Sequence, residues 1–571
     1  MTKNLKKDSS LFWRYCKDKK AQSNKKVLTY NGSELSDAKI IADTFAQHFL
    51  TSHNHSQPNV SCTSEEVSDP NRHIHIESFS ENDIVQAIWD IPEKKAPGTD
   101  GLPAILFKKC CQSLKGPLTL LINFSLKDCE FPSVLKEAIV KPVPKKGSTD
   151  ISNHRPISLL NTISKIYECA LYNKIAQFVF SSISPNQHGF VRKKSTMSNL
   201  AEFCDFTADA MAKKKQVDVL YCDAMKCFDT LHHVAIRDKL IQAGFSSSLT
   251  KLIYHYLRER KNFVVFENQN SDMFTPPSGV VQGSKLSSLL FILTFDDVKR
   301  HIRSSEYKMY ADDIKIFKVI QSTSDCEKLQ EDLDTVQNWM NSIGLKFHPN
   351  KCYKMSYTKS KTIIPYTYHI GDINLENIES YSDLGVTISN KLNWTEHIQD
   401  ITSKSYKKLG MVIRFCKMIE DPDAILLLYN TIVRSKIEYC SPIWTPKTQT
   451  AMYAIERVQR CFVRYLFQKL NGFYPKYPNY IEYETLIENL PIESLESRLK
   501  NNQIKYLKNI LTNRINSSEL TSNIKFRVAD ARLRDNPDNN LFLVSKDETP
   551  SPTISAMKHY NTMNQKPDLF I

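Results

Sequence analysis

Residues 307–317 read Tyr307-Lys308-Met309-Tyr310-Ala311-Asp312-Asp313-Ile314-Lys315-Ile316-Phe317. The pair of aspartates is flanked by two runs that have the alternating pattern of β-strands. Because aspartate favours turns, we expect a β-hairpin that carries both carboxylates at its tip. Two adjacent aspartates in an ordinary exposed turn would look the same, so the meaning of this hairpin depends on what lies beside it.

A second segment, Val217–Cys222, is an apolar strand that ends in Asp223, and the next residues turn the chain into a helix. If this strand lies beside the hairpin, Asp223, Asp312 and Asp313 surround one point. Magnesium takes oxygen ligands and leaves positions for water and phosphate. Two such ions roughly 3.5–4 Å apart can hold both the attacking and the leaving oxygen of a phosphoryl transfer. The two segments together predict that chemistry.

A third segment is a glycine-containing turn, Pro277–Ser284, followed by an apolar helix. Glycine lets the backbone approach a bound base or sugar closely. A turn that enters a helix is common, so this segment is weak evidence when it is taken alone.

The composition favours a polyanionic partner. Lys and Arg number 76 against 62 Asp and Glu, a net charge of +14 over 571 residues. Basic side chains release counterions from phosphate backbones, which favours nucleic acid, although a protein that is merely basic has the same composition. The length suggests three or more structural units.

The cysteines and apolar segments indicate an intracellular protein without a membrane segment. The 14 cysteines include no Cys-x-x-Cys pair, so we expect reduced, mostly buried thiols and no zinc site. The N-terminus lacks the apolar stretch of a signal peptide. The most apolar segment, Leu289–Phe295, is far shorter than the ~20 residues that a membrane span needs.

Secondary-structure signals change along the chain. A polar run, Thr51–Arg72, has the composition of a linker, and Ser80–Asp83 has the pattern of a capped helix start. From Ala138 to Phe317 short β-type runs alternate with helical segments, which is typical of an α+β fold. Amphipathic helices dominate after about residue 390, and the polar last ~50 residues are expected to lack stable structure.

The order of these segments resembles motifs A, B and C of reverse transcriptases. Motif A corresponds to Asp223 with Phe228 and Asp229, motif B to Ser278–Ser284, and motif C to Tyr310–Asp313. Other segments resemble the polymerase of non-LTR (LINE-type) retrotransposons, jockey-like elements in particular: Ala96–Gly101, Lys141–Gly147, Asn153–Leu160, Gln187–Phe190, Trp339–Lys351, Tyr381–Val386, Asn393–Ile398 and Trp444–Pro446. Each motif alone is modest, but so many in one order are specific.

The resemblance implies a right-hand polymerase of the α+β class, with fingers, palm, thumb and a helical C-terminal region. The implied divisions are 1–78 (a connecting segment after an endonuclease), 79–124 (an N-terminal extension of the fingers), 125–388 (fingers and palm), 389–520 (thumb and C-terminal helices) and 521–571 (a polar tail). Because no endonuclease is recognisable ahead of the polymerase motifs, the chain resembles a 5′-truncated copy.

The resemblance also implies roles for individual residues. Asp223, Asp312 and Asp313 would be catalytic and bind two Mg²⁺ ions. The residues expected to bind the nucleotide are Arg155, Phe228, Gln282, Gly283 and Lys351, of which Lys351 is a candidate general acid for pyrophosphate. Tyr310 would support the hairpin near the primer end. A core phenylalanine and a surface arginine remain the alternatives for Phe228 and Arg155, and Asp229 is interpreted as a structural carboxylate at a helix start.

The implied function is RNA-directed DNA polymerisation, with an RNA template, a DNA primer or target DNA, and dNTPs as partners, in the nucleus. The chain departs from the family pattern at Val281, Ser287, Ser288 and His348, changes that would loosen the nucleotide pocket. A folded but inactive nucleic-acid-binding remnant is therefore an alternative. A viral RNA-dependent RNA polymerase is a weaker one, since Ala311 and Phe228 differ from its usual pattern.

Overall fold

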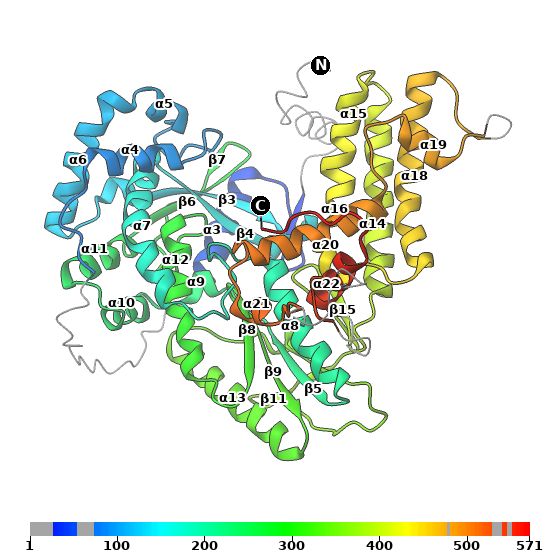
Figure 1. The fold of residues 1–571 in the computed structure, drawn as a ribbon. Coiled ribbons are helices and arrows are strands. Elements are labelled where there is room, and N and C mark those ends of the chain that lie inside the picture. Colours follow the sequence, from blue (N-terminus) through cyan, green and yellow to red (C-terminus); the bar gives the residue numbers. More distant parts are fainter. Residues whose placement is uncertain (1–26, 54–73, 477–479, 528–539, 545–550, 571) are drawn as a thin grey trace.

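The computed structural model describes residues 27–53, 74–476, 480–527, 540–544 and 551–570. Two β-sheets surrounded by helices are followed by a mainly helical region from residue 395 onward, drawn in yellow to red in Figure 1. The α+β class that the sequence predicted is confirmed.

A central sheet of five strands carries the predicted hairpin. Its strand order is β13-β10-β5-β9-β8, and β5 runs antiparallel to both of its neighbours. The strands are β5 (Gln216–Cys222), β8 (Glu306–Tyr310), β9 (Asp313–Ile320), β10 (Tyr353–Tyr357) and β13 (Glu376–Asn377). Strands β8 and β9 pair from Glu306↔Phe317 to Tyr310↔Asp313, so the hairpin expected from the sequence is confirmed.

Strand β5 is buried along its whole length because both faces of the central sheet are covered. Side chains alternate between the faces of a strand. Val217, Val219 and Tyr221 therefore face one hydrophobic core, whereas Leu220 and Cys222 face another. The first core includes α8 (Thr196–Ala212), and the second includes α7 (Thr162–Ser182), α12 (Lys285–Phe295) and α13 (Thr323–Ser342).

A second sheet of four strands has the order β4-β3-β6-β7. Its strands are β3 (Glu137–Pro144), β4 (His154–Leu160), β6 (Lys261–Phe266) and β7 (Gln269–Asn270). Further helices of this part of the chain are α4 (Glu81–Asp90), α5 (Ala104–Lys109), α6 (Cys111–Asp128), α10 (His233–Gln242) and α11 (Ser247–Leu257). Helix α4 begins with a capping box between Ser80 and Asp83, as the sequence predicted.

The N-terminal described segment packs on this second sheet. It forms a short hairpin, β1 (Leu28–Tyr30) and β2 (Ser33–Leu35), and then α3 (Ala38–Thr51). A small core of its own joins α3 to the sheet: Ile41, Phe45 and Phe49 of α3 share it with Val140 and Val264. Although the segment precedes the predicted linker, it is a folded part of the polymerase-like unit.

The C-terminal helices share the core behind β5. They are α14 (Thr395–Cys416), α15 (Pro422–Leu428), α16 (Ser435–Glu438), α17 (Ser441–Trp444), α18 (Gln449–Asn471), α19 (Tyr483–Glu488), α20 (Leu495–Leu511), α21 (Ser518–Ser522) and α22 (Pro552–Thr562). A π-helical turn, Tyr429–Arg434, joins α15 to α16. Two small antiparallel pairs complete the strands: β11 (His369–Ile370) with β12 (Ile373–Asn374), and β14 (Ser380–Asp383) with β15 (Val386–Ser389).

One expectation is wrong: the last residues do not all lack structure. Helix α22 buries Ala556, Met557 and Tyr560 in the core behind β5. Its start is tied to α8, because the amide of Thr553 donates to the carboxylate of Asp205 over 3.3 Å. The helix is too polar to be recognised by composition, and tertiary packing stabilises it.

Two further expectations concern membranes and thiols. Over the described ranges, no helix is long and apolar enough to cross a membrane. Most cysteines of the same ranges are buried, as the sequence predicted.

Candidate active site

A cleft of about 900 Å³ gathers most of the residues that the sequence predicted for the site. The residues of that prediction which line it are Arg155, Asp223, Phe228, Gln282, Gly283, Asp312 and Lys351. Asp313 and Tyr310 are not among the lining residues. The lining residues lie in or directly next to strands of both sheets, and in nearby loops and helix ends. The cleft therefore lies where the two sheets meet.

Strand register places the three carboxylates at one end of the central sheet. Cys222 pairs with Ile314 across β5 and β9. In antiparallel pairing the next residue of one strand meets the preceding residue of the other, so Asp223 follows opposite Asp313. Asp312 occupies the turn of the hairpin, one residue away. The convergence that was predicted from two separate sequence segments is confirmed.

The like charges of these carboxylates repel one another. Desolvation and the neighbouring charge of Asp223 raise the pKa of Asp312. Partial desolvation, then repulsion from Asp312 and Asp223, raises the pKa of Asp313 to about 7. Among the described residues, no group of three or more His, Cys, Asp or Glu side chains is arranged to hold a metal ion. The three carboxylates are thus close together and repel one another. Their oxygen atoms are ligands that suit a hard cation, although they are not arranged as a complete metal site.

The turn of the hairpin is held by a residue whose role the sequence did not reveal. Ala311 has φ of 59°, a conformation that usually belongs to glycine. The buried side chain of Gln187 accepts from the amide of Ala311 (2.9 Å) and donates to its carbonyl (3.2 Å). The side-chain oxygen of Gln187 also accepts from the amide of Gly189 over 2.7 Å. Gln187 had been noted only as part of a motif that resembles the family.

Gly189 has to be glycine for a steric reason. A Cβ atom at this position would lie 2.1 Å from the amide nitrogen of Ala311. The contact would be with backbone, which cannot move without moving the hairpin. The loop of Gln187 and Gly189 therefore fixes where Asp312 stands.

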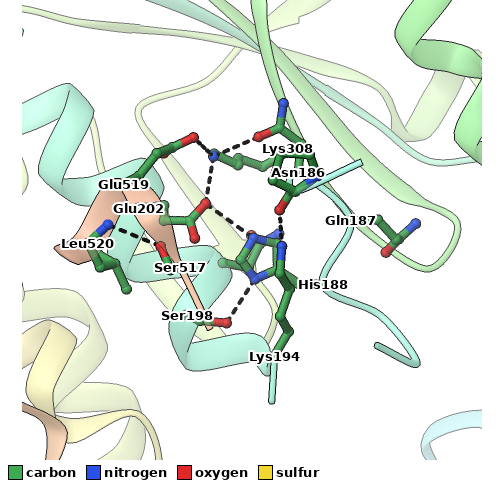
Figure 2. Close-up of polar contacts among 12 residues, drawn as sticks. Asn186, Gln187, His188, Lys194, Ser198, Glu202, Lys308, Ser517, Glu519 and Leu520 are labelled. Carbon is green, nitrogen blue, oxygen red and sulfur yellow. Dashed lines mark hydrogen bonds and ion pairs between the residues drawn. The ribbon is translucent and has the colours of Figure 1, made fainter. Parts of the chain in front are cut away.

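A buried ionic cluster supports the hairpin from behind (Figure 2). The ammonium group of Lys308 on β8 lies 2.5 Å from Glu202 of α8 and 2.6 Å from Glu519 of α21, and it also donates to Asn186. Lys308 and Glu202 are almost fully buried. The cluster joins the hairpin of Asp312 and Asp313 to one helix of the sheet and to one C-terminal helix.

His188 completes this cluster as a neutral residue. Burial lowers its pKa to about 4, in spite of the nearby carboxylate. Its Nε2 lies 3.2 Å from Glu202 and its Nδ1 lies 2.8 Å from the hydroxyl of Ser198. Because a carboxylate only accepts, we assign the proton to Nε2. Hydrogen bonds from His188 and Lys308, together with the charge of Lys308, outweigh desolvation and lower the pKa of Glu202 to about 2.

The loop before α12 packs directly on the turn after β5. Gln282 donates from its side chain to the carboxylate of Asp229 over 2.7 Å, and its carbonyl accepts from the amide of Ser158 on β4. A Cβ at Gly279 would lie 2.5 Å from the carbonyl oxygen of Phe228. The side chain of Asp229 is thus engaged by Gln282, which supports its interpretation as a structural carboxylate.

The departures from the family pattern are accommodated in this loop. Ser287 is fully buried, and its hydroxyl accepts from the amide of Val281 over 3.1 Å. Ser284 caps α12 and donates to the buried carboxylate of Glu168, which also accepts from Tyr256. The hydroxyl of Ser287 therefore fastens the loop, contrary to the expectation that it would loosen the pocket.

An aromatic residue and a basic wall complete the cleft. Phe228 stacks on Phe291 with ring centroids 4.6 Å apart and is half-buried, so it belongs both to the core and to the cleft. Burial and the charges of Arg155 and Lys351 lower the pKa of Lys145. The ammonium group of Lys351 lies 3.5 Å from the carboxylate of Asp223. Crowded cations opposite crowded carboxylates suit a ligand that carries phosphates and metal ions together.

Comparison with known proteins agrees with this geometry. The sequence profile of the family described as reverse transcriptase (RNA-dependent DNA polymerase) matches residues 143–413, which include Asp223, Asp312 and Asp313. This region belongs to the reverse transcriptase family. The match begins within β3 and ends within α14, so both sheets of this reverse transcriptase contribute to it.

The relatives of this reverse transcriptase include polymerases of mobile elements, jockey among them. It is 24% identical over 538 residues to the RNA-directed DNA polymerase from mobile element jockey of Drosophila melanogaster, which covers 89% of this chain and 57% of the relative. It is 26% identical over 421 residues to the probable RNA-directed DNA polymerase from transposon BS of the same species, covering 70% and 46%. The chain spans about half the length of these curated relatives. The predicted resemblance is confirmed as distant homology over most of the chain.

Solved telomerase structures are also similar. The apo telomerase from Candida tropicalis, truncated from the C-terminal domain, has a TM-score of 0.34 at 13% identity, covering 47% of this chain and 57% of that one. The telomerase from Candida albicans has a TM-score of 0.32 at 12% identity, covering 68% and 69%.

Proposed function

We propose that this chain is an RNA-directed DNA polymerase that transfers nucleotides from dNTPs to the 3′-hydroxyl of a DNA primer on an RNA template. One observation supports this most strongly: the register of β5 and β9 brings Asp223 to the hairpin of Asp312 and Asp313, in a cleft with a basic wall. Target DNA is a further partner, and the nucleus is the expected location for an element that copies itself into DNA.

The residues of the cleft have distinct roles in this proposal. Two magnesium ions held by Asp223, Asp312 and Asp313 would activate the primer hydroxyl and neutralise the charge that develops on the phosphates. Arg155 would orient the triphosphate, since a planar guanidinium suits phosphate oxygens. Lys351, which stands beside Asp223, would protonate the departing pyrophosphate.

The nucleotide itself would lie against the loop before α12. Gln282 and Gly283 line the cleft next to Phe228. Phe228, held by Phe291, would lie under the sugar and select against a 2′-hydroxyl. Tyr310, at the end of β8, would support the hairpin near the primer terminus.

The proposed regions keep the boundaries that the family resemblance implies. We assign 125–388 to fingers and palm, with 79–124 as an N-terminal extension of the fingers, and 389–520 to the thumb and C-terminal helices. The four-stranded sheet would be the core of the fingers and the five-stranded sheet the core of the palm. Residues 1–78 and 521–571 would flank this unit.

The test is extension of a primed poly(A) template by the purified chain with dTTP and magnesium. We expect incorporation by the wild-type protein and none above background by Asp312→Ala, because that carboxylate stands at the hairpin tip. Asp372→Ala is the matched control, since Asp372 is an exposed aspartate in the turn between β11 and β12, and it should incorporate normally. Folded, RNA-binding wild-type protein that incorporates nothing would contradict the proposal and favour the inactive remnant.

A further inference from the structure

The C-terminal end of α3 forms part of the wall of the cleft. His48, Phe49 and Ser52 line it, beside the turn that follows β5. This segment lies ahead of residues 143–413, the part of the chain that the family profile matches. The small core under α3 holds it on the four-stranded sheet. A segment outside the matched region therefore reaches the proposed nucleotide site.

His53, just beyond α3, joins the two loops that form this site. Its Nδ1 lies 2.8 Å from the carbonyl oxygen of Asp229 and 2.9 Å from that of Ser278. Both oxygens only accept, so Nδ1 must carry a proton that is shared between them. The neighbouring Ser52 accepts from the ammonium group of Lys226 over 2.6 Å.

The junction that His53 contacts sets the positions of two proposed nucleotide-binding residues. The hydroxyl of Ser278 donates to the carbonyl of Asp229 (2.7 Å), and the amide of Val280 donates to the carbonyl of Phe228 (2.7 Å). Gln282, four residues after Ser278, reaches back to the carboxylate of Asp229. A shift between the two loops would thus move Phe228 and Gln282 relative to each other.

We propose that His53 is a positioning residue for the incoming nucleotide, holding the loop of Phe228 and Asp229 against the loop of Ser278 and Gln282. The inference rests on the proposed polymerase function for its kinetic consequence. Its structural part, the restraint of two loops by one imidazole, does not depend on activity. His53 binds backbone carbonyls of the two loops, so we expect an effect on nucleotide binding more than on the chemical step.

The experiment compares His53→Ala, His53→Asn and His75→Ala in the full chain. Asparagine carries two amide hydrogens and can donate to both carbonyls, so it is the conservative variant. His75 is an exposed histidine of the same N-terminal part, 3.4 Å from Ser246 and outside the cleft, and it serves as the control. The measurements are the KM for dTTP and kcat on primed poly(A), and hydrogen exchange of residues 226–231 and 278–283.

For His53→Ala we expect the KM for dTTP to rise roughly three- to tenfold, as for the loss of one buried hydrogen-bonding group, with kcat within about twofold of the wild type. Exchange in both loops should become faster. His53→Asn should restore both values, and His75→Ala should change neither. A purely structural role would instead reduce the active fraction and lower kcat at constant KM.

Unchanged KM and unchanged loop exchange in His53→Ala would overturn the inference, as would a fall in kcat alone. If the wild-type protein incorporates no nucleotide, the proposed function fails. The exchange measurement then still decides whether His53 restrains the two loops, so the two failures are distinguishable.

Discussion

Gly189 and Ala311 lie in backbone contact at the turn that carries Asp312. The left-handed conformation of Ala311 is an unfavourable one for a residue with a side chain, by about 1–2 kcal/mol. Gln187 holds it with two hydrogen bonds. The position of Asp312 therefore depends on a loop far from it in sequence, and a small change in that loop should affect the proposed catalysis more than folding.

We predict that Gly189→Ala abolishes primer extension while the protein remains folded. The added Cβ would lie 2.1 Å from the amide nitrogen of Ala311, so the hairpin must move. Gly116→Ala is the control: it lies inside α6, where the new Cβ would be 3.5 Å from the side chain of Glu81, and it should raise stability by up to about 1 kcal/mol. Extension assays and thermal unfolding of both variants check this. Normal extension by Gly189→Ala would mean that the loop does not set the hairpin.

At the scale of single elements, the sequence predicted those whose pattern is local. The hairpin and β5 alternate or end in recognisable turn residues, so both were identified together with their carboxylates. Gln187 and His53 were not assigned these roles, because each acts through backbone atoms of residues more than a hundred positions away. No local pattern records such contacts. Ser287 was misjudged for a related reason: the pattern showed an unusual residue but not the amide that it binds.

Helix α22 is a whole element that no local sequence pattern predicted. Its composition is polar, and in the structure Ser551 is its N-cap and Pro552 its first residue. We predict that Met557→Ala lowers the free energy of unfolding by about 2–5 kcal/mol, since Met557 is 1% exposed in the core behind β5. Met273→Ala, at a position that is 60% exposed, should change it little. Denaturant unfolding of both variants measures the difference, and equal stability would show that α22 does not belong to this core.

For the whole molecule, buried neutral histidines should make stability depend on pH. Burial lowers the pKa of His188, His233 and His397 to about 4. Below pH 6.5 the unfolded chain binds protons that the folded chain does not. The stability that these groups provide is therefore complete above pH 6.5 and is lost as pH falls toward 4.

We predict that stability falls between pH 6.5 and 4.5 and that His188→Asn removes one histidine's share of the fall. At 1.36 kcal/mol for each pKa unit, that share is about 2–3 kcal/mol. The window stops at pH 4.5 because the low pKa of Glu202 adds its own loss below that value. Denaturant unfolding at several pH values compares the variant with the wild type. Parallel curves for the two proteins would contradict the assignment of a neutral, buried His188.

The core shared by β5, α8 and the C-terminal helices bears on how the protein can be produced. A fragment trimmed to residues 143–413 would keep all three aspartates, yet it would lose the C-terminal helices that share a hydrophobic core with Val217, Val219 and Tyr221 and would expose part of that core. It would also lack α3 with its small core. Such a fragment should aggregate on expression, since large bare apolar surfaces associate. The insolubility of this fragment would result from a boundary that cuts through a hydrophobic core. It would not show that the full chain is inactive.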